Sequence, residues 1–142
     1  MNDERRIVTI LFADVSGSTA LGESLDPEDM RALLGRYYAL AREVVEAHGG
    51  IVEKFIGDAV MAIFGLPRAH GDDAERALAA TAELRTRFRA EPALTCIELR
   101  FGVSTGDVVA GRDQSGGDFL VTGDAVNLAA RSKYYKSQKI NT

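Results

Sequence analysis

Cysteine and tryptophan are nearly missing from this sequence, which has one cysteine and no tryptophan among its 142 residues. The single Cys96 cannot form an internal disulfide bond, and without a Cys-x-x-Cys pair we expect no zinc site of that type. No apolar run reaches about 18 residues, so we predict no membrane segment. The net charge of −4 gives no overall basic character, so we predict no nucleic-acid partner.

The residues that are present are typical of one globular domain. Hydrophobic residues make up 46% of the chain and charged residues 27%. A chain near this size buries about 70% of the surface that its unfolded form exposes. The N-terminus carries four charged residues at 3–6 and the apolar stretch after them is short, which indicates the start of a strand rather than a secretion signal. We therefore expect a cytoplasmic protein.

Expected strands and helices alternate along the sequence. A helix is predicted to begin at the capping acid Asp26, which proline follows, and to end at Gly49. Asp72 and Asp73 are predicted to cap a second long helix. The remaining elements are strands at 6–13, 51–56, 59–64, 99–105, from 108 and at 118–122, and a last helix at 124–131.

Glycine-acid pairs between expected strands indicate where the chain turns. Two expected hairpins, at residues 57–58 and 106–107, require antiparallel strand pairs. We therefore predict an α+β fold of the ferredoxin-like kind, in which helices pack on one mixed sheet.

Two aspartates stand at the ends of expected strands. Asp14 follows the strand at 6–13, and Asp58 lies in the turn between the strands at 51–56 and 59–64. If the fold brings them together, two like charges about 4 Å apart repel by roughly 4 kcal/mol at an effective dielectric of about 20. A divalent cation would relieve this repulsion. Carboxylates without nearby Cys or His favour Mg²⁺ or Mn²⁺ over Zn²⁺.

A small polar segment, Gly17-Ser18-Thr19, follows Asp14 and offers backbone N–H groups at an expected helix start. Such a position favours phosphate. Structural explanations stay open: Asp14 as a cap or turn acid, Asp58 as a hairpin-turn acid, and residues 17–19 as a plain capping turn.

Four segments together resemble the catalytic domain of class III nucleotide cyclases, the adenylyl and guanylyl cyclases. They are FADVSGST (12–19), VEKFIGDAVMAIFG (52–65), LRFGVSTGDVVAG (99–111) and VTGDAVNLAAR (121–131). The ordered set is specific, whereas any one segment alone is weak. The resemblance implies that residues 1–131 form the catalytic domain, without the C-terminal part of the family domain, and that residues 132–142 are a non-matching basic tail.

The resemblance implies a metal and phosphate site. Asp14 and Asp58 would bind two ions of Mg²⁺ or Mn²⁺ per site, and the Val15 carbonyl would be a further ligand. Residues 17–19 would hold the β- and γ-phosphates. These roles agree with the chemistry of the two acids and of the glycine-containing segment described above.

The resemblance also implies residues that read the base and assist catalysis. Lys54 would bind the adenine ring, which favours ATP over GTP. Leu120 occupies the second base-reading position, where a leucine cannot accept a hydrogen bond from the adenine amino group. Asn127 would position the ribose, and Arg131, on the same helix face, would stabilise charge at the α-phosphate. Structural alternatives are a solvated strand lysine for Lys54, a helix-start hydrogen bond for Asn127 and a surface salt bridge for Arg131.

The implied activity is that of an adenylate cyclase, which converts ATP into 3′,5′-cyclic AMP and pyrophosphate in signal transduction. The family builds its site between two domains, so we expect a homodimer with active sites at its interface and a regulatory domain outside this chain. The alternatives are a catalytically weak or inactive ATP-binding regulatory domain and a guanylate cyclase. A diguanylate cyclase shares the sheet layout, but its Gly-Gly-Asp/Glu-Glu-Phe hairpin is absent.

Four further residues are expected to be structural. We expect His48 and His70 to be structural or solvated, and Tyr37 and Tyr38 to serve core and dimer packing rather than to stack on a base.

Overall fold

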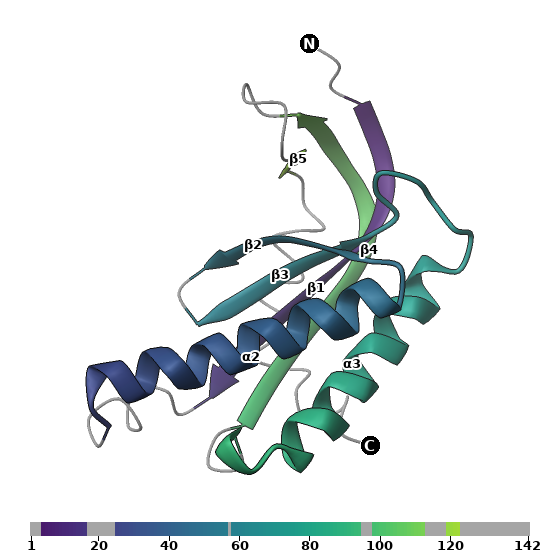
Figure 1. The fold of residues 1–142 in the computed structure, drawn as a ribbon. Helices are drawn as coiled ribbons and strands as arrows, with labels where there is room; N and C mark the ends of the chain where they lie inside the picture. Colours follow the sequence, from purple (N-terminus) through teal and green to yellow (C-terminus); the bar gives the residue numbers. More distant parts are fainter. Residues whose placement is uncertain (1–3, 17–24, 57, 95–97, 113–118, 123–142) are drawn as a thin grey trace.

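The computed structural model describes residues 4–16, 25–56, 58–94, 98–112 and 119–122, which Figure 1 shows as a coloured ribbon. In chain order the elements are β1 (Glu4–Ser16), α2 (Pro27–Ala47), β2 (Ile51–Ile56), β3 (Ala59–Phe64), α3 (Asp73–Ala90), a short 3₁₀ helix η1 (Pro92–Leu94), β4 (Glu98–Arg112) and β5 (Phe119–Thr122). This order confirms the predicted α+β class.

The five strands form one sheet in the order β2-β3-β1-β4-β5. Every pairing among these described strands is antiparallel, where the sequence led us to expect a mixed sheet. The reason is that the connection through α2 places β2 two positions away from β1 in the sheet, which leaves the position next to β1 free. The returning strand of the hairpin, β3, takes that position and runs opposite to β1.

Strand β4 is one continuous strand, so the prediction of a turn at residues 106–107 is wrong. Gly106 pairs with Val8 and Asp107 pairs with Ile7 of β1. A Gly-Asp pair favours a turn only where no partner strand competes. Here β1 begins at Glu4 and supplies backbone partners across the whole segment.

Both long helices lie against the same face of the sheet (Figure 1). Alternate residues of β1, among them Ala13 and Val15, pack with Tyr37 of α2 and Leu84 of α3 in a large buried cluster. The residues between them, such as Phe12, belong to a second buried cluster on the opposite face. None of the helices in the described ranges is long and apolar enough to cross a membrane.

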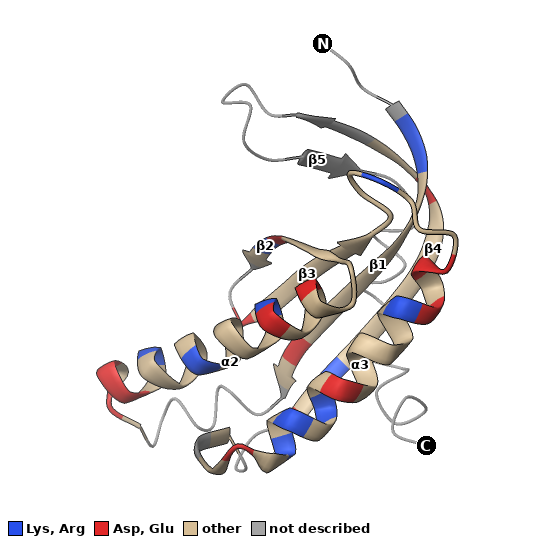
Figure 2. Ribbon diagram, turned by 45° about the vertical axis from the view of Figure 1, so that its right-hand side comes forward, with Lys and Arg blue, Asp and Glu red and all other residues tan. Residues whose placement is uncertain are grey.

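The helix ends confirm part of the sequence prediction. Pro27 occupies the first turn of α2, as expected, but the Asp26 side chain makes no capping hydrogen bond. Asp72 precedes α3 without capping it, because its carboxylate accepts a 2.7 Å hydrogen bond from Arg76 instead. The C-terminal turn of α3 carries Arg87 and Arg89, and Figure 2 shows basic residues gathered towards this end. Cations there suit the negative end of the helix dipole.

Candidate functional site

Asp14 and Asp58 are neighbours in the folded chain. Asp14 lies near the end of β1, and Asp58 lies in the turn between β2 and β3. The β1–β3 ladder pairs Asp14 with Ala59, the residue directly after Asp58. Opposed residues of antiparallel strands have Cα atoms about 4.5–5.5 Å apart. Asp14 is buried, with 7% of its surface exposed, and Asp58 is half-buried.

Tyr37 on α2 lies close to both acids. Its hydroxyl donates a 2.7 Å hydrogen bond to the backbone carbonyl of Ala13, the residue before Asp14. Burial raises the pKa of the Tyr37 phenol well above its usual value, and the charges of Asp14, Tyr38 and Asp58 raise it further. The hydrogen bond to Ala13 places the Tyr37 phenol next to the peptide unit that leads into Asp14.

Asp14 lies on the face of the sheet opposite to the two helices. Its neighbours Ala13 and Val15 point into the cluster that contains the helices, so alternation directs Asp14 the other way. Arg100 of β4 is paired directly with Asp14 and has the same orientation, since Leu99 and Phe101 also point towards the helices. Opposed side chains on one face of an antiparallel pair are about 4.5–5.5 Å apart at Cβ.

Lys54 reaches the same face because of a register shift in β2. The β2–β3 ladder pairs Val52 with Ala62 and Lys54 with Met61, so Glu53 is an additional residue in β2. Regular alternation would give Lys54 the orientation of Val52, towards the helices. With the extra residue, Lys54 is exposed and lies on the face of Met61 and Asp14. Bulges of this kind re-aim side chains.

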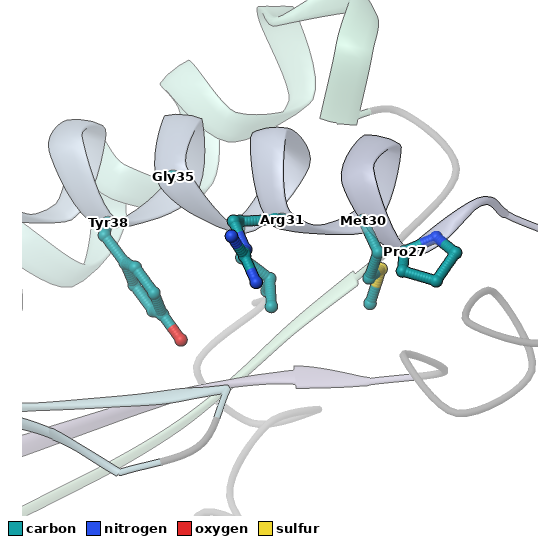
Figure 3. A pocket seen from close by; sticks show the side chains of 6 residues that line it. Pro27, Met30, Arg31, Gly35 and Tyr38 are labelled. Atoms are coloured by element: carbon teal, nitrogen blue, oxygen red, sulfur yellow. The ribbon is translucent and has the colours of Figure 1, made fainter.

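A pocket of about 540 Å³ opens beside the first half of α2, lined by Pro27, Met30, Arg31, Leu34, Gly35 and Tyr38. In Figure 3 the side chains of Met30, Arg31 and Tyr38 extend from the helix towards the strands. Burial raises the pKa of the Tyr38 phenol, and the charge of Asp58 raises it further. The centroid of the Tyr38 ring lies 4.5 Å from that of Phe55, so this end of the pocket lies beside the last residues of β2. Its volume is in the range of small-molecule sites.

The structure describes only some of the residues that the sequence singled out. Val15 is buried at the end of β1, next to Asp14. The backbone of Leu120 lies in β5 opposite Gly111. The predicted phosphate loop and the predicted catalytic pair lie outside the described residues, so their roles stay predictions; these are Gly17, Ser18, Thr19, Asn127 and Arg131.

Sequence reasoning missed two residues that lie beside the acids. Arg100 stands between two core positions of a strand, and this alternation was a signal that it faces away from the helices. The contact of Tyr37 with the Ala13 carbonyl had no sequence signal, because it depends on how α2 sits on β1. His48 and His70 pair with acids of α3: the ring of His48 lies 2.8 Å from Glu83, and that of His70 lies 3.2 Å from Asp73.

The donor groups beside Asp14 fit a hard divalent cation. The Asp14–Ala59 pairing brings Asp14 next to the turn that contains Asp58, and no histidine or cysteine is part of this ladder. Oxygen donors of this kind suit Mg²⁺ or Mn²⁺. Within the described part of the chain, three or more His, Cys, Asp or Glu side chains never gather in one possible metal site. A metal here would therefore depend on the two acids together with backbone or ligand oxygens.

The chain matches the family model described as "Adenylate and Guanylate cyclase catalytic domain" over residues 2–141. An uncharacterized protein of Mycobacterium tuberculosis (strain ATCC 25618 / H37Rv) is 35% identical over 133 residues, which are 92% of this chain and 24% of that protein. A second uncharacterized protein of the same strain is 33% identical with the same coverage. The chain thus spans about a quarter of the length of the curated relatives it matches.

Solved structures of both cyclase types resemble this fold. The guanylyl cyclase Cya2 is 34% identical with a TM-score of 0.87, over 95% of this chain and 73% of that chain. The adenylyl cyclase CyaB from P. aeruginosa is 28% identical with a TM-score of 0.86, over 95% of this chain and 74% of that chain. Since the two names differ in the base of the substrate, the likeness leaves ATP and GTP undistinguished.

Proposed function

This chain belongs to the family of adenylate and guanylate cyclase catalytic domains, and we propose that it converts ATP into 3′,5′-cyclic AMP and pyrophosphate. The observation that carries the proposal is the adjacency of Asp14 and Asp58, with Arg100 paired to Asp14 on the same face. Two acids and a cation at one end of the sheet suit a polyphosphate with divalent metal.

Asp14 and Asp58 are the proposed metal ligands, with the Val15 carbonyl as a third protein donor. Two ions of Mg²⁺ or Mn²⁺, when bound, would activate the ribose 3′-hydroxyl and balance the charge of the phosphate oxygens. The β1–β3 ladder pairs Asp14 with Ala59, the residue after Asp58, and so keeps the two acids in adjacent parts of the chain. Two carboxylates within about 4 Å of each other would repel, and a cation bound between them would relieve this repulsion.

Arg100 is a proposed phosphate-binding residue. A guanidinium offers paired N–H donors that match phosphate oxygens. Its pairing with Asp14 brings a positive charge next to the proposed metal ligands. We expect it to hold the triphosphate where the residues at 17–19 bind the β- and γ-phosphates.

Lys54 is proposed to bind the base of the nucleotide, and a lysine at this position favours ATP over GTP as the substrate. The register shift at Glu53 gives this lysine an exposed position on the face of Asp14. Leu120 stands at the second base-reading position and offers no polar group to adenine or guanine. Discrimination would then depend on Lys54 alone.

Asn127 and Arg131 are the proposed ribose and α-phosphate residues, and two chains are proposed to share each site. One chain would supply Asp14 and Asp58, and the other would supply Lys54 with this pair. Neither an Asp58→Ala chain nor an Arg131→Ala chain should then be active alone. A mixture of the two should regain activity at one site per dimer, and a mixture that stays inactive would contradict the shared site.

The substrate is tested with ATP and GTP in parallel, each with Mn²⁺, followed by separation of the cyclic products. Formation of cyclic AMP in excess of cyclic GTP supports the proposal. Cyclic GTP as the main product would show that the chain is a guanylate cyclase and that the role given to Lys54 is wrong. In a Lys54→Ala variant we expect the preference for ATP to disappear.

A regulatory ATP-binding domain without turnover is the second candidate, favoured by the leucine at position 120. Retention of ATP with Mn²⁺ and no cyclic product would select it. A regulatory domain elsewhere in a longer protein and a cytoplasmic location stay predictions from the sequence, as does the boundary at residue 131.

A further inference from the structure

Tyr37 connects helix α2 to strand β1 at the peptide bond that precedes Asp14. The hydroxyl donates to the Ala13 carbonyl at 2.7 Å, and the tyrosine is 0% exposed. This hydrogen bond joins a helix side chain to the backbone of a central strand. It therefore sets the position of the strand relative to the helix next to one of the two acids.

The ring of Tyr37 is held on two sides. The centroid of the Tyr38 ring lies 5.4 Å from that of Tyr37, and the Phe88 ring of α3 packs edge-on with its centroid 5.9 Å away. Aromatic contacts of this kind favour a defined ring orientation. The hydroxyl thus has a fixed direction, and a phenylalanine at this position would keep the ring contacts and lose only the hydrogen bond.

The hydrogen bond acts on Asp14 through the planar peptide unit. The carbonyl oxygen of Ala13 and the Cα atom of Asp14 belong to the same peptide plane, which rotates as one body. A donor that holds the carbonyl restricts the rotation of this plane and so the direction of the Cα–Cβ bond of Asp14. Burial and the nearby acids favour the protonated phenol, so the donor is present at neutral pH.

We propose that Tyr37 is a positioning residue for the metal site, whose hydroxyl orients the Asp14 carboxylate through the Ala13 peptide. The inference rests on the proposed function, because it requires Asp14 to be a metal ligand. It adds a link between α2 and the site: a shift of the helix against the sheet would change the direction of this ligand.

The test compares binding of Mn²⁺ alone, followed by the paramagnetic resonance signal of the free ion, in the whole chain and in three variants. Tyr37→Phe should bind Mn²⁺ about tenfold more weakly, as expected for the loss of a supporting contact around a ligand. Asp14→Asn should lose the site.

Thr81→Val is the matched control, because Thr81 is also 0% exposed and its hydroxyl donates a 2.9 Å hydrogen bond to the Ala77 carbonyl. It should bind Mn²⁺ as the wild-type chain does. Thermal unfolding of all variants checks that each is folded at the temperature of the titration.

The outcomes separate the inference from the proposed function. Wild-type affinity in Tyr37→Phe, together with loss of binding in Asp14→Asn, overturns the positioning role and leaves the metal site in place. Wild-type affinity in Asp14→Asn overturns the metal site and the inference with it. An equal loss in Thr81→Val and Tyr37→Phe also overturns the inference, because the effect would then follow from general destabilisation.

Discussion

Replacement of Gly50 by alanine should destabilise the fold through a single steric contact. Gly50 lies between α2 and β2, and its N–H donates a 2.9 Å hydrogen bond to the Val45 carbonyl. A Cβ atom here would lie 2.6, 2.8 and 2.9 Å from three atoms of the Phe64 ring, where ordinary contacts are 3.4–4 Å. Glycine is therefore required at position 50 because the backbone approaches the ring closely, and not because the residue has a positive φ angle.

The cost follows from how little the ring can move. Phe64 is 0% exposed at the end of β3, so the ring would have to displace other core side chains. Overpacking of a core typically costs about 1–3 kcal/mol. For a chain of this size that loss lowers the melting temperature by roughly 3–10 °C. The loss in the free energy of unfolding is measured by equilibrium urea unfolding of Gly50→Ala, followed by circular dichroism.

Gly35 provides the matched control for the same substitution. It lies inside α2, and a Cβ there would have no atom within 4 Å. Alanine in a helix interior is favoured over glycine by about 1 kcal/mol, so Gly35→Ala should be more stable than the wild-type chain. The reasoning is refuted if Gly50→Ala is as stable as wild type, or if both variants change stability in the same direction.

Three further predictions concern the pH dependence of stability, Arg100 beside Asp14, and the hydroxyl pair of Thr9 and Thr105. The hydrogen bond from His48 lowers the pKa of Glu83 in the folded chain. The stabilisation from this carboxylate is therefore present above the pKa of Glu83 in the unfolded chain and is lost as pH falls through its pKa in the folded chain. On acidification, Glu83→Gln should lose stability less steeply than the wild-type chain. Arg100→Ala should lower kcat/KM for ATP by about 10²-fold or more, and unchanged turnover would exclude a phosphate role. Thr9→Val removes the 2.8 Å hydroxyl contact with Thr105 and should cost about 1 kcal/mol in urea unfolding.

Local sequence signals were sufficient for most of the elements. Proline after an acid at residue 26 marked the start of α2, and the Gly-Asp pair at residues 57–58 marked the turn between β2 and β3. The same Gly-Asp signal failed at residues 106–107. The difference is tertiary: the first pair has strands of matched length on either side, whereas β1 continues past the second pair and keeps it extended.

The candidate site was predictable only where it depended on motifs. The motifs identified Asp14 and Asp58, and the structure brings them to adjacent positions, although their role as metal ligands stays a prediction. The neighbours of Asp14 depend on strand order and register, which the sequence does not state. Arg100 is next to Asp14 because β4 pairs with β1 in one particular register, and Tyr37 is next to it because of the packing of α2.

The two long helices lie on one face of the sheet, and three charged residues of the candidate site lie on the other. Asp14, Lys54 and Arg100 come from three strands and share the face opposite to the helices. The extra residue at Glu53 is needed for this grouping, since regular pairing would direct Lys54 towards α2. Among the described residues, the helices can influence the charged face through the backbone of the strands. Tyr37 is a contact of that kind, because its hydroxyl holds the carbonyl of Ala13 while Asp14 points to the other side.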